Sequence, residues 1–454
     1  MNLNCRTLLF FLVLATTSSG LAQSGDVKEK PNPTSDQRPA RVLFDEANTY
    51  LEKKFAEFNK QKIAYDQTLE KKTKQEQKDL AVRNAATLKA RYGLTGNDLY
   101  YLGMLYHIAG DGDQALKIMR QFLAKNGATE NAQIARAVVV LYTTRKDLIP
   151  EAVAAVAAYR EGKPQDVAEL YGMETLLVEE FSKAKDYESM TGHAKGMLDV
   201  AHRGKDSRKF VGLNRDEKLF KAASLLAEAL DKSGQKKAAI ATIEDLLKLS
   251  VSLPSAYLYK IARVRLASLN PATDLLKVLE GIDLANHPPE IVATQWIDQQ
   301  PMKLAQLRGR VVLLDFWAPW CGPCRYTFPK LQKWHETYKD QGLVILGLTN
   351  YYGHAEGRKL TPAEELAYLE EFKKKNGLSY GFVVTDSRVN DLNYGAYSLP
   401  TSFLIDRSGR VRFISLGAND LESVQLDRMI RQVLAETVPQ TESITERAGT
   451  SKQN

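Results

Sequence analysis

Two cysteines separated by two residues directly follow an apolar segment, and this arrangement constrains the fold more than any other feature of the chain. The segment Val311–Phe316 is apolar and β-prone apart from one aspartate, which predicts a buried central strand. The strand is expected to end in the loop over 317–320, and a helix is expected to begin at about Cys321. Cys324 then lies one helical turn further on, within reach of a disulfide bond with Cys321.

The expected position of Cys321 at a helix N-terminus suits thiol–disulfide chemistry. Unpaired backbone N–H groups and the helix dipole stabilise a thiolate there, so Cys321 is predicted to be the attacking nucleophile. Cys324 is predicted to be more buried and to resolve the mixed disulfide by attacking Cys321. Gly322 and Pro323 keep the intervening loop tight, and proline suits a first helical turn. A purely structural disulfide is the alternative.

Asp315 interrupts the apolar strand six positions before Cys321. A carboxyl group in a buried strand is desolvated, which raises its pKa. Asp315 could then take the proton from Cys324 as that thiol attacks, and return it in the reverse direction. The alternative is a structural aspartate whose oxygens are satisfied by local hydrogen bonds.

A proline further along the chain precedes another expected strand. Leu399 and Pro400 lie directly before the strand-like run 402–405, and proline is permitted at the start of a strand. If the peptide bond before Pro400 is cis, the backbone of Leu399 is exposed beside the cysteines. That backbone could pair with an extended client segment and guide its disulfide onto Cys321. A trans turn proline is the alternative.

The C-terminal third of the chain alternates strand-like and helix-like runs. Prolines at 288 and 289 cannot continue a helix and mark a domain boundary at about 286. The strand-like runs that follow are Ala293–Ile297, Val311–Phe316, Leu343–Leu348, Phe382–Thr385, Ser402–Ile405 and Val411–Ser415. Helical runs are expected at about 324–340, 362–376 and 420–436, with a polar loop over 351–362. This order predicts parallel βαβ pairing followed by a hairpin.

Residues from about 288 to 436 resemble thioredoxin-fold proteins, and more closely the exported TlpA/ResA-type thiol–disulfide oxidoreductases. The segments that carry the resemblance are Leu307–Arg310, Asp315–Ala318, Trp320–Arg325, Pro329 and Leu399–Asp406. The resemblance covers about a third of the chain. It implies an α/β thioredoxin fold, a cis Pro400, and exchange of a dithiol for a disulfide with protein clients.

The same resemblance implies further properties of the site and its setting. The substrate-binding residues are expected to be Trp320, Gly322, Pro323, Leu399 and Pro400. No cofactor is expected beyond the redox-active Cys321–Cys324 pair. The family is bacterial and extracytoplasmic, commonly acts as a reductant supplied by a membrane-bound electron donor, and serves steps such as cytochrome c maturation. Many members carry an acidic residue two or three positions after the second cysteine, and residues 325–327 offer none.

The preceding region, 41–285, is predicted to be an all-α array, which makes the chain multidomain. Within residues 97–123 the spacing of key residues resembles a tetratricopeptide repeat, and these residues are Leu102, Gly103, Tyr106, Gly110, Ala115 and Phe122. A weaker match is formed by Leu226, Ala227, Gly234, Ala239 and Leu246. The small residues Gly103 and Ala115 would let two helices approach closely. Such an array could bind a partner peptide or protein on a concave face, or act as a structural spacer.

The start of this helical region has its own periodicity. From about Val42 to Arg91 the sequence predicts one charged helical stretch. Its apolar residues recur at spacings of 7, 4, 3, 7 and 4, which places on one helical face Phe44, Leu51, Phe55, Phe58, Tyr65 and Leu69. This face predicts either a coiled-coil arm or a helix that packs on the next domain.

The two ends of the chain are expected to lie outside the folded domains. Residues 1–22 have a positive charge at Arg6, an apolar run and small residues at the end, which predicts a cleaved signal peptide and an extracytoplasmic protein. An uncleaved membrane anchor is the alternative. Residues 23–40 are polar and contain proline, which predicts a disordered linker, and a disordered tail is expected over 437–454.

Composition excludes several function classes. The net charge of +7 is spread along the chain without a basic block, so nucleic-acid binding is not expected. Six scattered histidines and two close thiols do not supply the four ligands of a zinc site, so no metal site is expected. The sequence therefore predicts an exported thiol–disulfide oxidoreductase, with a reductase favoured by the Gly-Pro pair between the cysteines. The alternative is an extracytoplasmic protein-binding scaffold whose redox module is accessory.

Overall fold

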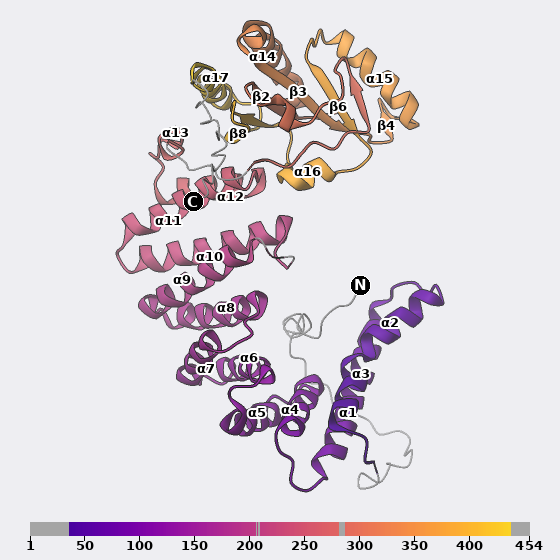
Figure 1. Ribbon diagram of the computed structural model, residues 1–454, viewed down its shortest axis with the longest axis vertical. Coiled ribbons are helices and arrows are strands. Elements are labelled where there is room, and N and C mark those ends of the chain that lie inside the picture. The colour runs from indigo at the N-terminus through magenta and orange to yellow at the C-terminus, as the bar shows by residue number, and fades with distance from the viewer. Residues whose placement is uncertain (1–35, 206, 208, 281–286, 437–454) are drawn as a thin grey trace, which may run out of the picture. The chain divides into compact units, whose positions relative to one another are not determined.

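The computed structural model describes residues 36–205, 207, 209–280 and 287–436 (Figure 1). The predicted signal peptide, most of the predicted linker, the predicted tail and residue 286 of the predicted boundary lie outside these residues. The chain divides into two compact units. One contains the residues up to Phe210 together with Glu228–Gly234, and the other contains Val211–Ala227 and the residues from Gln235 onwards.

The described residues of the first unit are mainly helical, as the sequence predicts. Its helices are α1 (Ala40–Asn48), α2 (Tyr50–Lys60), α3 (Gln67–Lys89), α4 (Asn97–Ala109), α5 (Gly112–Asn126), α6 (Glu130–Thr144), α7 (Ile149–Glu161), α8 (Val167–Ala184) and α9 (Tyr187–Gly204). Aspartate side chains cap several N-termini by accepting hydrogen bonds from first-turn N–H groups, and these are Asp66, Asp111, Asp166 and Asp186. From α4 to α9, each helix packs on the next (Figure 1).

The close approach of α4 and α5 depends on a small residue, as predicted. A Cβ atom on Gly103 would lie 2.9 Å from the terminal methyl carbon of Met119, so α5 occupies the space that a side chain would need. Ala115 is fully buried in the same pair of helices. The resemblance of these helices to tetratricopeptide repeats stays a prediction.

The single helical stretch predicted from Val42 to Arg91 is wrong, because the chain forms three helices there. A turn separates α2 from α3, and within it Lys62 has a positive φ of 56°. Asp66 then caps α3 and begins a new helix with a new set of faces. Tyr65 is 79% exposed, so the six apolar residues do not share one buried face. Helices α1 and α3 pack against α4, which confirms a packed region rather than a coiled-coil arm.

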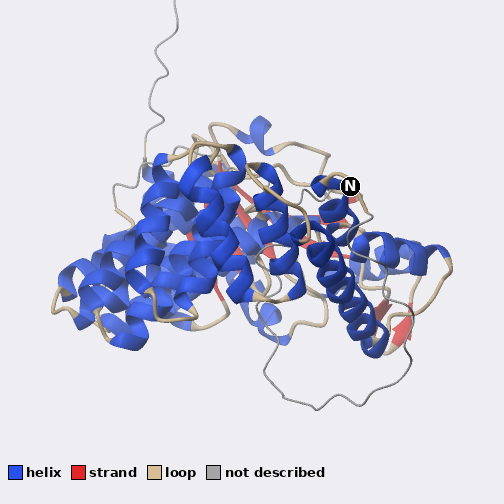
Figure 2. Cartoon of the chain, turned by 90° about the horizontal axis from the view of Figure 1, so that it is seen from below, coloured by secondary structure: helices blue, strands red, loops and turns tan. Residues whose placement is uncertain are grey.

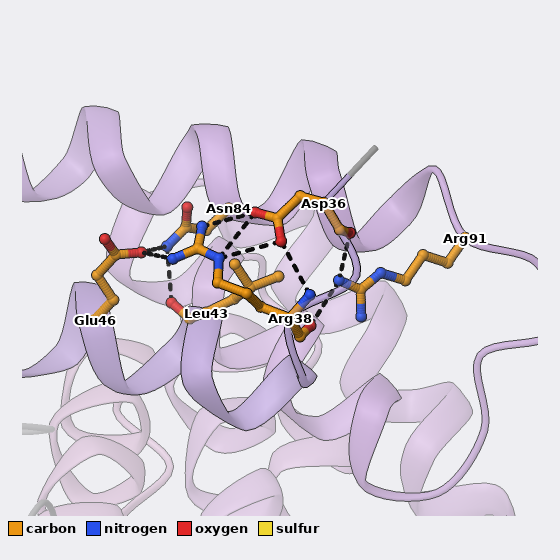
Figure 3. A network of polar contacts seen from close by, with 6 residues as sticks. All are labelled: Asp36, Arg38, Leu43, Glu46, Asn84 and Arg91. Atoms are coloured by element: carbon orange, nitrogen blue, oxygen red, sulfur yellow. Dashed lines mark hydrogen bonds and ion pairs between the residues drawn. The ribbon is translucent and has the colours of Figure 1, made fainter. Parts of the chain in front are cut away.

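A polar network holds the start of α1 against α3 (Figure 3). Arg38 forms ion pairs with Asp36 at 2.7 Å and with Glu46 at 3.1 Å. Arg91, which follows α3, donates hydrogen bonds to the backbone carbonyls of Asp36 and Arg38. Asn84 of α3 donates to Glu46 and to a backbone carbonyl of α1. The end of the predicted linker is therefore tied to the helical unit.

The second unit contains helices from before the predicted domain boundary as well as a sheet after it. Its first helices are α10 (Gly212–Lys232, in this unit up to Ala227), α11 (Lys236–Ser252), α12 (Ala256–Leu269) and α13 (Leu275–Val278). Its strands are β1 (Gln295–Ile297), β2 (Val311–Phe316), β3 (Leu343–Asn350), β4 (His354–Ala355), β5 (Arg358–Lys359), β6 (Gly381–Thr385), β7 (Thr401–Ile405) and β8 (Val411–Leu416). Its later helices are α14 (Gly322–Tyr338), α15 (Pro362–Lys375), α16 (Val389–Tyr394) and α17 (Asp420–Ala435).

Among the described residues, six strands form one mixed sheet in the order β1-β6-β3-β2-β7-β8. Strand β2 is parallel to β3, and β3 is parallel to β6, whereas β7, β8 and β1 are antiparallel to their neighbours. The predicted βαβ pairing followed by a hairpin is therefore confirmed. Figure 2, with helices blue and strands red, shows how far helix outweighs strand in the chain.

The sheet is covered on both faces, and alternation along β2 divides its side chains between them. Phe316 contacts Tyr394 of α16 at a ring-centroid distance of 5.4 Å. Trp317 contacts Phe328 of α14 at 5.4 Å and Phe372 of α15 at 5.5 Å, on the opposite face. Because Asp315 and Trp317 are two residues apart, the aspartate also faces α14.

Three features of this unit depart from the sequence prediction. The polar loop predicted over 351–362 contains the short hairpin β4–β5, whose strands pair His354 with Lys359. Helix α16 was not predicted, because it has six residues and no extended apolar periodicity. The first strand of the sheet begins two residues later than predicted, at Gln295.

Candidate redox site

The two predicted catalytic cysteines form a disulfide bond at the start of α14. Their sulfur atoms are bonded and their Cα atoms are 5.3 Å apart. Cys321 is the N-cap of α14, and its Sγ accepts a hydrogen bond from the backbone N–H of Cys324 at 3.2 Å. Cys321 is 5% exposed, whereas Cys324 has no exposed surface. A visiting molecule therefore reaches Cys321 first.

Exposed residues surround the disulfide on the solvent side. Gly322 and Pro323 occupy the first positions of α14 and are exposed. Trp320 is 59% exposed, and its ring contacts that of Tyr352 at 5.4 Å and nearly at a right angle. An exposed indole held by a second aromatic ring can cover the apolar part of a bound peptide.

Arg325 fixes the loop that leads into the disulfide. Its guanidinium group donates two hydrogen bonds to the backbone carbonyl of Pro319, at 2.7 and 3.3 Å. The same group lies 5.3 Å from the ring centre of Phe372 on α15. Arg325 therefore contacts both the loop before Cys321 and helix α15.

Asp315 lies in the sheet beneath α14 and is 1% exposed. Its register partners are Ser402 on β7 and Gly347 on β3. The Ser402 hydroxyl donates a hydrogen bond to Oδ1 of Asp315 at 2.7 Å. Burial raises the pKa of Asp315 to about 7, and the bond from Ser402 opposes this shift. The carboxyl group can therefore bind and release a proton near neutral pH.

One oxygen of this carboxyl group, Oδ2, has no hydrogen-bond partner among the described residues, and the same holds for two buried polar atoms near it, Nε1 of Trp317 and the hydroxyl of Tyr380. The indole nitrogen lies over β3, since a Cβ atom on Gly347 would be only 2.8 Å from it. Burial, and secondly the charge of Asp315, raise the pKa of Tyr380 well above its ordinary value. The carboxyl group thus has polar neighbours inside an otherwise apolar core.

The peptide bond between Leu399 and Pro400 is cis, as predicted. Pro400 is buried and Leu399 is half-buried. The pairing of β2 with β7 matches Phe316 with Thr401, so the residues that follow β2 and those that precede β7 lie at the same end of the sheet. The cysteines follow β2 and Pro400 precedes β7, so the predicted site residues come from one end of the sheet.

Known proteins match the segment that carries this geometry. Residues 286–414 match the model of the AhpC/TSA family. The thiol-disulfide oxidoreductase ResA of Geobacillus kaustophilus is 31% identical over 147 residues, which are 32% of this chain and 76% of that protein.

The chain belongs to the ResA-type thiol–disulfide oxidoreductase family. Protein DipZ of Mycobacterium bovis is 30% identical over 183 residues, and the chain spans only 25% of that protein's length. The structure of a thiol-disulfide isomerase from Corynebacterium glutamicum is 23% identical and covers 33% of this chain and 97% of its own, with a TM-score of 0.29. The ResA-type match accounts for the redox domain, and the helices before it are additional to it.

Two other features are absent from the described residues. No group of three or more His, Cys, Asp or Glu side chains is arranged in them to hold a metal ion. No helix in the same residues combines the length and apolar character needed to cross a membrane.

Sequence reasoning assigned no role to three residues that support the site: Ser402, Tyr352 and Arg325. Ser402 acts on Asp315 through strand register, which the sequence does not reveal. Tyr352 lies in the segment predicted as a loop. Arg325 adjoins Cys324 and could have been singled out, because a long cation next to a thiol can interact with the surrounding loop.

Proposed function

We propose that the protein exchanges its Cys321–Cys324 dithiol and disulfide with the disulfides and thiols of protein clients. The observation that carries this proposal is the disulfide at the N-terminus of α14, with Cys321 as the N-cap and Cys324 buried behind it. Backbone N–H groups at the start of a helix stabilise a thiolate on the N-cap cysteine when the pair is reduced.

The reaction in the reducing direction has two steps. The Cys321 thiolate attacks one sulfur of a client disulfide, forming a mixed disulfide and releasing the other client sulfur as a thiolate. The Cys324 thiol then gives its proton to the Asp315 carboxylate and attacks Sγ of Cys321. This attack forms the Cys321–Cys324 disulfide and releases the second client thiolate. Two electrons pass from the protein to the client.

Residues around the disulfide would bind the client backbone and side chains. In this proposal the backbone of Leu399, before the cis Pro400, pairs with an extended client segment. Trp320, Gly322 and Pro323 form the remaining contact surface, and their exposure supports this role. The helices of the first unit offer a further surface for a peptide or protein partner.

The setting of the reaction is also a proposal. We infer that residues 1–22 export the protein, which would then act outside the cytoplasm as a reductant. A membrane-bound dithiol donor would return the Cys321–Cys324 disulfide to the dithiol, and cytochrome c maturation is one step that such a reductant serves. A redox titration against glutathione tests the direction, because a potential near about −120 mV would mark an oxidant instead.

Reduction of insulin disulfides by the protein, with dithiothreitol as electron source, tests the proposal directly. Wild-type protein should accelerate the reaction, and the paired Cys321→Ser and Cys324→Ser replacement should abolish the acceleration. If the double variant retains every cellular role of the protein, this result favours the alternative of a protein-binding scaffold whose redox module is accessory.

A further inference from the structure

Helix α12, which precedes the redox domain in sequence, contacts the segment that leads into Leu399 and Pro400. A Cβ atom on Gly395 would lie 2.8 Å from Oγ of Ser255, the N-cap of α12, so the two backbones approach closely there. Two residues further along each segment, the rings of Tyr257 and Tyr397 meet at 6.0 Å. Ser255 is itself fixed, because its hydroxyl donates a hydrogen bond to Asp216 at 2.5 Å.

The other half of α12 contacts the segment that follows β8. The Arg263 guanidinium forms an ion pair of 2.6 Å with Glu422, whose side chain is 4% exposed. The second oxygen of Glu422 accepts hydrogen bonds from the backbone N–H of Leu416 and the hydroxyl of Ser415. The neighbouring Gly417 N–H donates to the carbonyl of Pro400 at 2.9 Å.

A buried aromatic pair lies between these two contacts. Tyr259 of α12 is fully buried, and its ring meets that of Phe413 on β8 at 6.5 Å. The Arg263 guanidinium lies 5.5 Å from the centre of the Tyr259 ring. Helix α12 therefore contacts, on both sides of Pro400, the two segments that hold this proline in place.

We infer that α12 is a positioning element for the client-binding segment Leu399–Pro400, and that Arg263 is its principal positioning residue. The inference rests on the proposed role of Leu399 and Pro400 in binding clients. Arg263 touches neither cysteine, so its removal should loosen the support of Pro400 without changing the disulfide itself. A protein client depends on that support, whereas a small disulfide that reacts directly at Cys321 does not.

Two matched variants test this inference in the full-length protein. Arg263→Ala removes the ion pair to Glu422, near the start of α17. Arg412→Ala removes a similar ion pair at the opposite end of β8, where Arg412 donates to Glu436 at 2.9 Å. The two arginine side chains are 21% and 25% exposed, but Glu422 is 4% exposed and Glu436 is 39% exposed, so Arg263→Ala should lose more stability than Arg412→Ala, and urea unfolding of both variants measures this difference. Only the first lies beside the Pro400 support.

Kinetics with two substrates separate positioning from stability. Arg263→Ala should raise the KM for insulin by about threefold or more and leave the rate with 5,5′-dithiobis(2-nitrobenzoate) unchanged. Arg412→Ala should leave the insulin KM and the rate with the small disulfide at their wild-type values. Arg263→Lys should bring the insulin KM most of the way back to the wild-type value. The inference is overturned if Arg263→Ala leaves the insulin KM unchanged, or if both alanine variants alter it equally.

A second measurement does not depend on turnover. Amide hydrogen exchange over residues 395–400 and 416–420 should be faster in Arg263→Ala than in the wild type, and unchanged in Arg412→Ala. Tyr257→Ala, at the other end of α12, should accelerate exchange over 395–400. Wild-type exchange in the Arg263 and Tyr257 variants would overturn the inference. Failure of the wild type to reduce insulin would count against the proposed function alone.

Discussion

Asp315 is the residue whose chemistry depends most on its surroundings. It is fully enclosed, receives one hydrogen bond from Ser402, and has a second oxygen without a partner among the described residues. An ionised carboxylate there is poorly solvated, which is why its pKa rises to about 7. The same imbalance that suits a proton acceptor also destabilises the folded state when the group is ionised.

Because the ionised Asp315 carboxylate destabilises the folded state, the free energy of unfolding depends on pH. The folded pKa of about 7 lies above the ordinary value of 3.8, so the folded state holds the proton more tightly than the unfolded state. Stability from this group is complete below about pH 4 and is lost as the pH rises from about 4 to about 7. Asp315→Asn should remove this loss and stabilise the protein at pH 8 by on the order of 2–4 kcal/mol.

Urea unfolding of the oxidised proteins at pH 5 and pH 8, followed by tryptophan fluorescence, measures this difference. The four tryptophans are Trp296, Trp317, Trp320 and Trp334, so the signal reports the second unit. Equal changes in the unfolding free energy of wild type and variant between the two pH values would contradict a raised pKa for Asp315.

The Asp315→Asn variant should also slow resolution of the mixed disulfide more than its formation.

Ser402 tunes the same carboxyl group. Its hydroxyl stabilises the ionised form, so Ser402→Ala should move the pH midpoint of the resolving step upward and cost about 1 kcal/mol of stability. Ser415→Ala, at the register partner of Ser402 on β8, is the control and should leave the midpoint in place. A stopped-flow pH profile of the resolving step measures the midpoint in both variants. An unshifted profile in Ser402→Ala would mean that Asp315 does not take the proton in the resolving step.

Strand β3 has no room for a side chain at Gly347, where the Trp317 ring lies over it. A Cβ atom on Gly347 would lie 2.8 Å from Nε1 of Trp317 and 3.1 Å from the ring of Phe382, and both rings are buried in tight contact. Gly347→Ala should therefore destabilise the second unit by about 1–3 kcal/mol. Thermal unfolding followed by tryptophan fluorescence measures the loss. In a Trp317→Phe background the same change should cost less, and equal costs would contradict the proposed contact.

The elements that the sequence predicted share a strong local signal. Strand β2 is an apolar run interrupted only by Asp315, and the N-terminus of α14 is marked by the two cysteines around Gly322 and Pro323, so both appear where they were expected. The cis bond before Pro400 came from the family resemblance. Helix α16 and the hairpin β4–β5 lack such signals, because they are short and polar. The contact between Asp315 and Ser402 depends on strand register, which no local pattern encodes.

At the level of the whole molecule, the attachment of the redox domain to the helices directly before it rests on side-chain contacts within the second unit. The prolines at 288 and 289 mark a change of composition, but α11 and α12 belong to the same compact unit as the sheet. Their attachment depends on particular side-chain contacts such as Tyr259 with Phe413 and Arg263 with Glu422. Periodicity shows which residues of a helix are apolar, but it does not show which neighbour they meet.

A comparison of two fragments tests this attachment. Residues 211–436 should form a more stable protein than residues 287–436, by at least about 2 kcal/mol, because loss of α12 exposes Phe413 and leaves Glu422 without its arginine. Urea unfolding followed by tryptophan fluorescence measures the difference. Equal stabilities would mean that α11 and α12 add nothing to the redox domain.

In the proposed reaction, Sγ of Cys321 is the sulfur that first bonds to a client. The direct measurement incubates Cys324→Ser and Cys321→Ser variants with insulin and counts mixed disulfides by mass spectrometry under non-reducing conditions. Cys324→Ser should accumulate insulin bound through Cys321, while Cys321→Ser should accumulate almost none. Equal trapping by both variants, or trapping by neither, would contradict the proposed reaction.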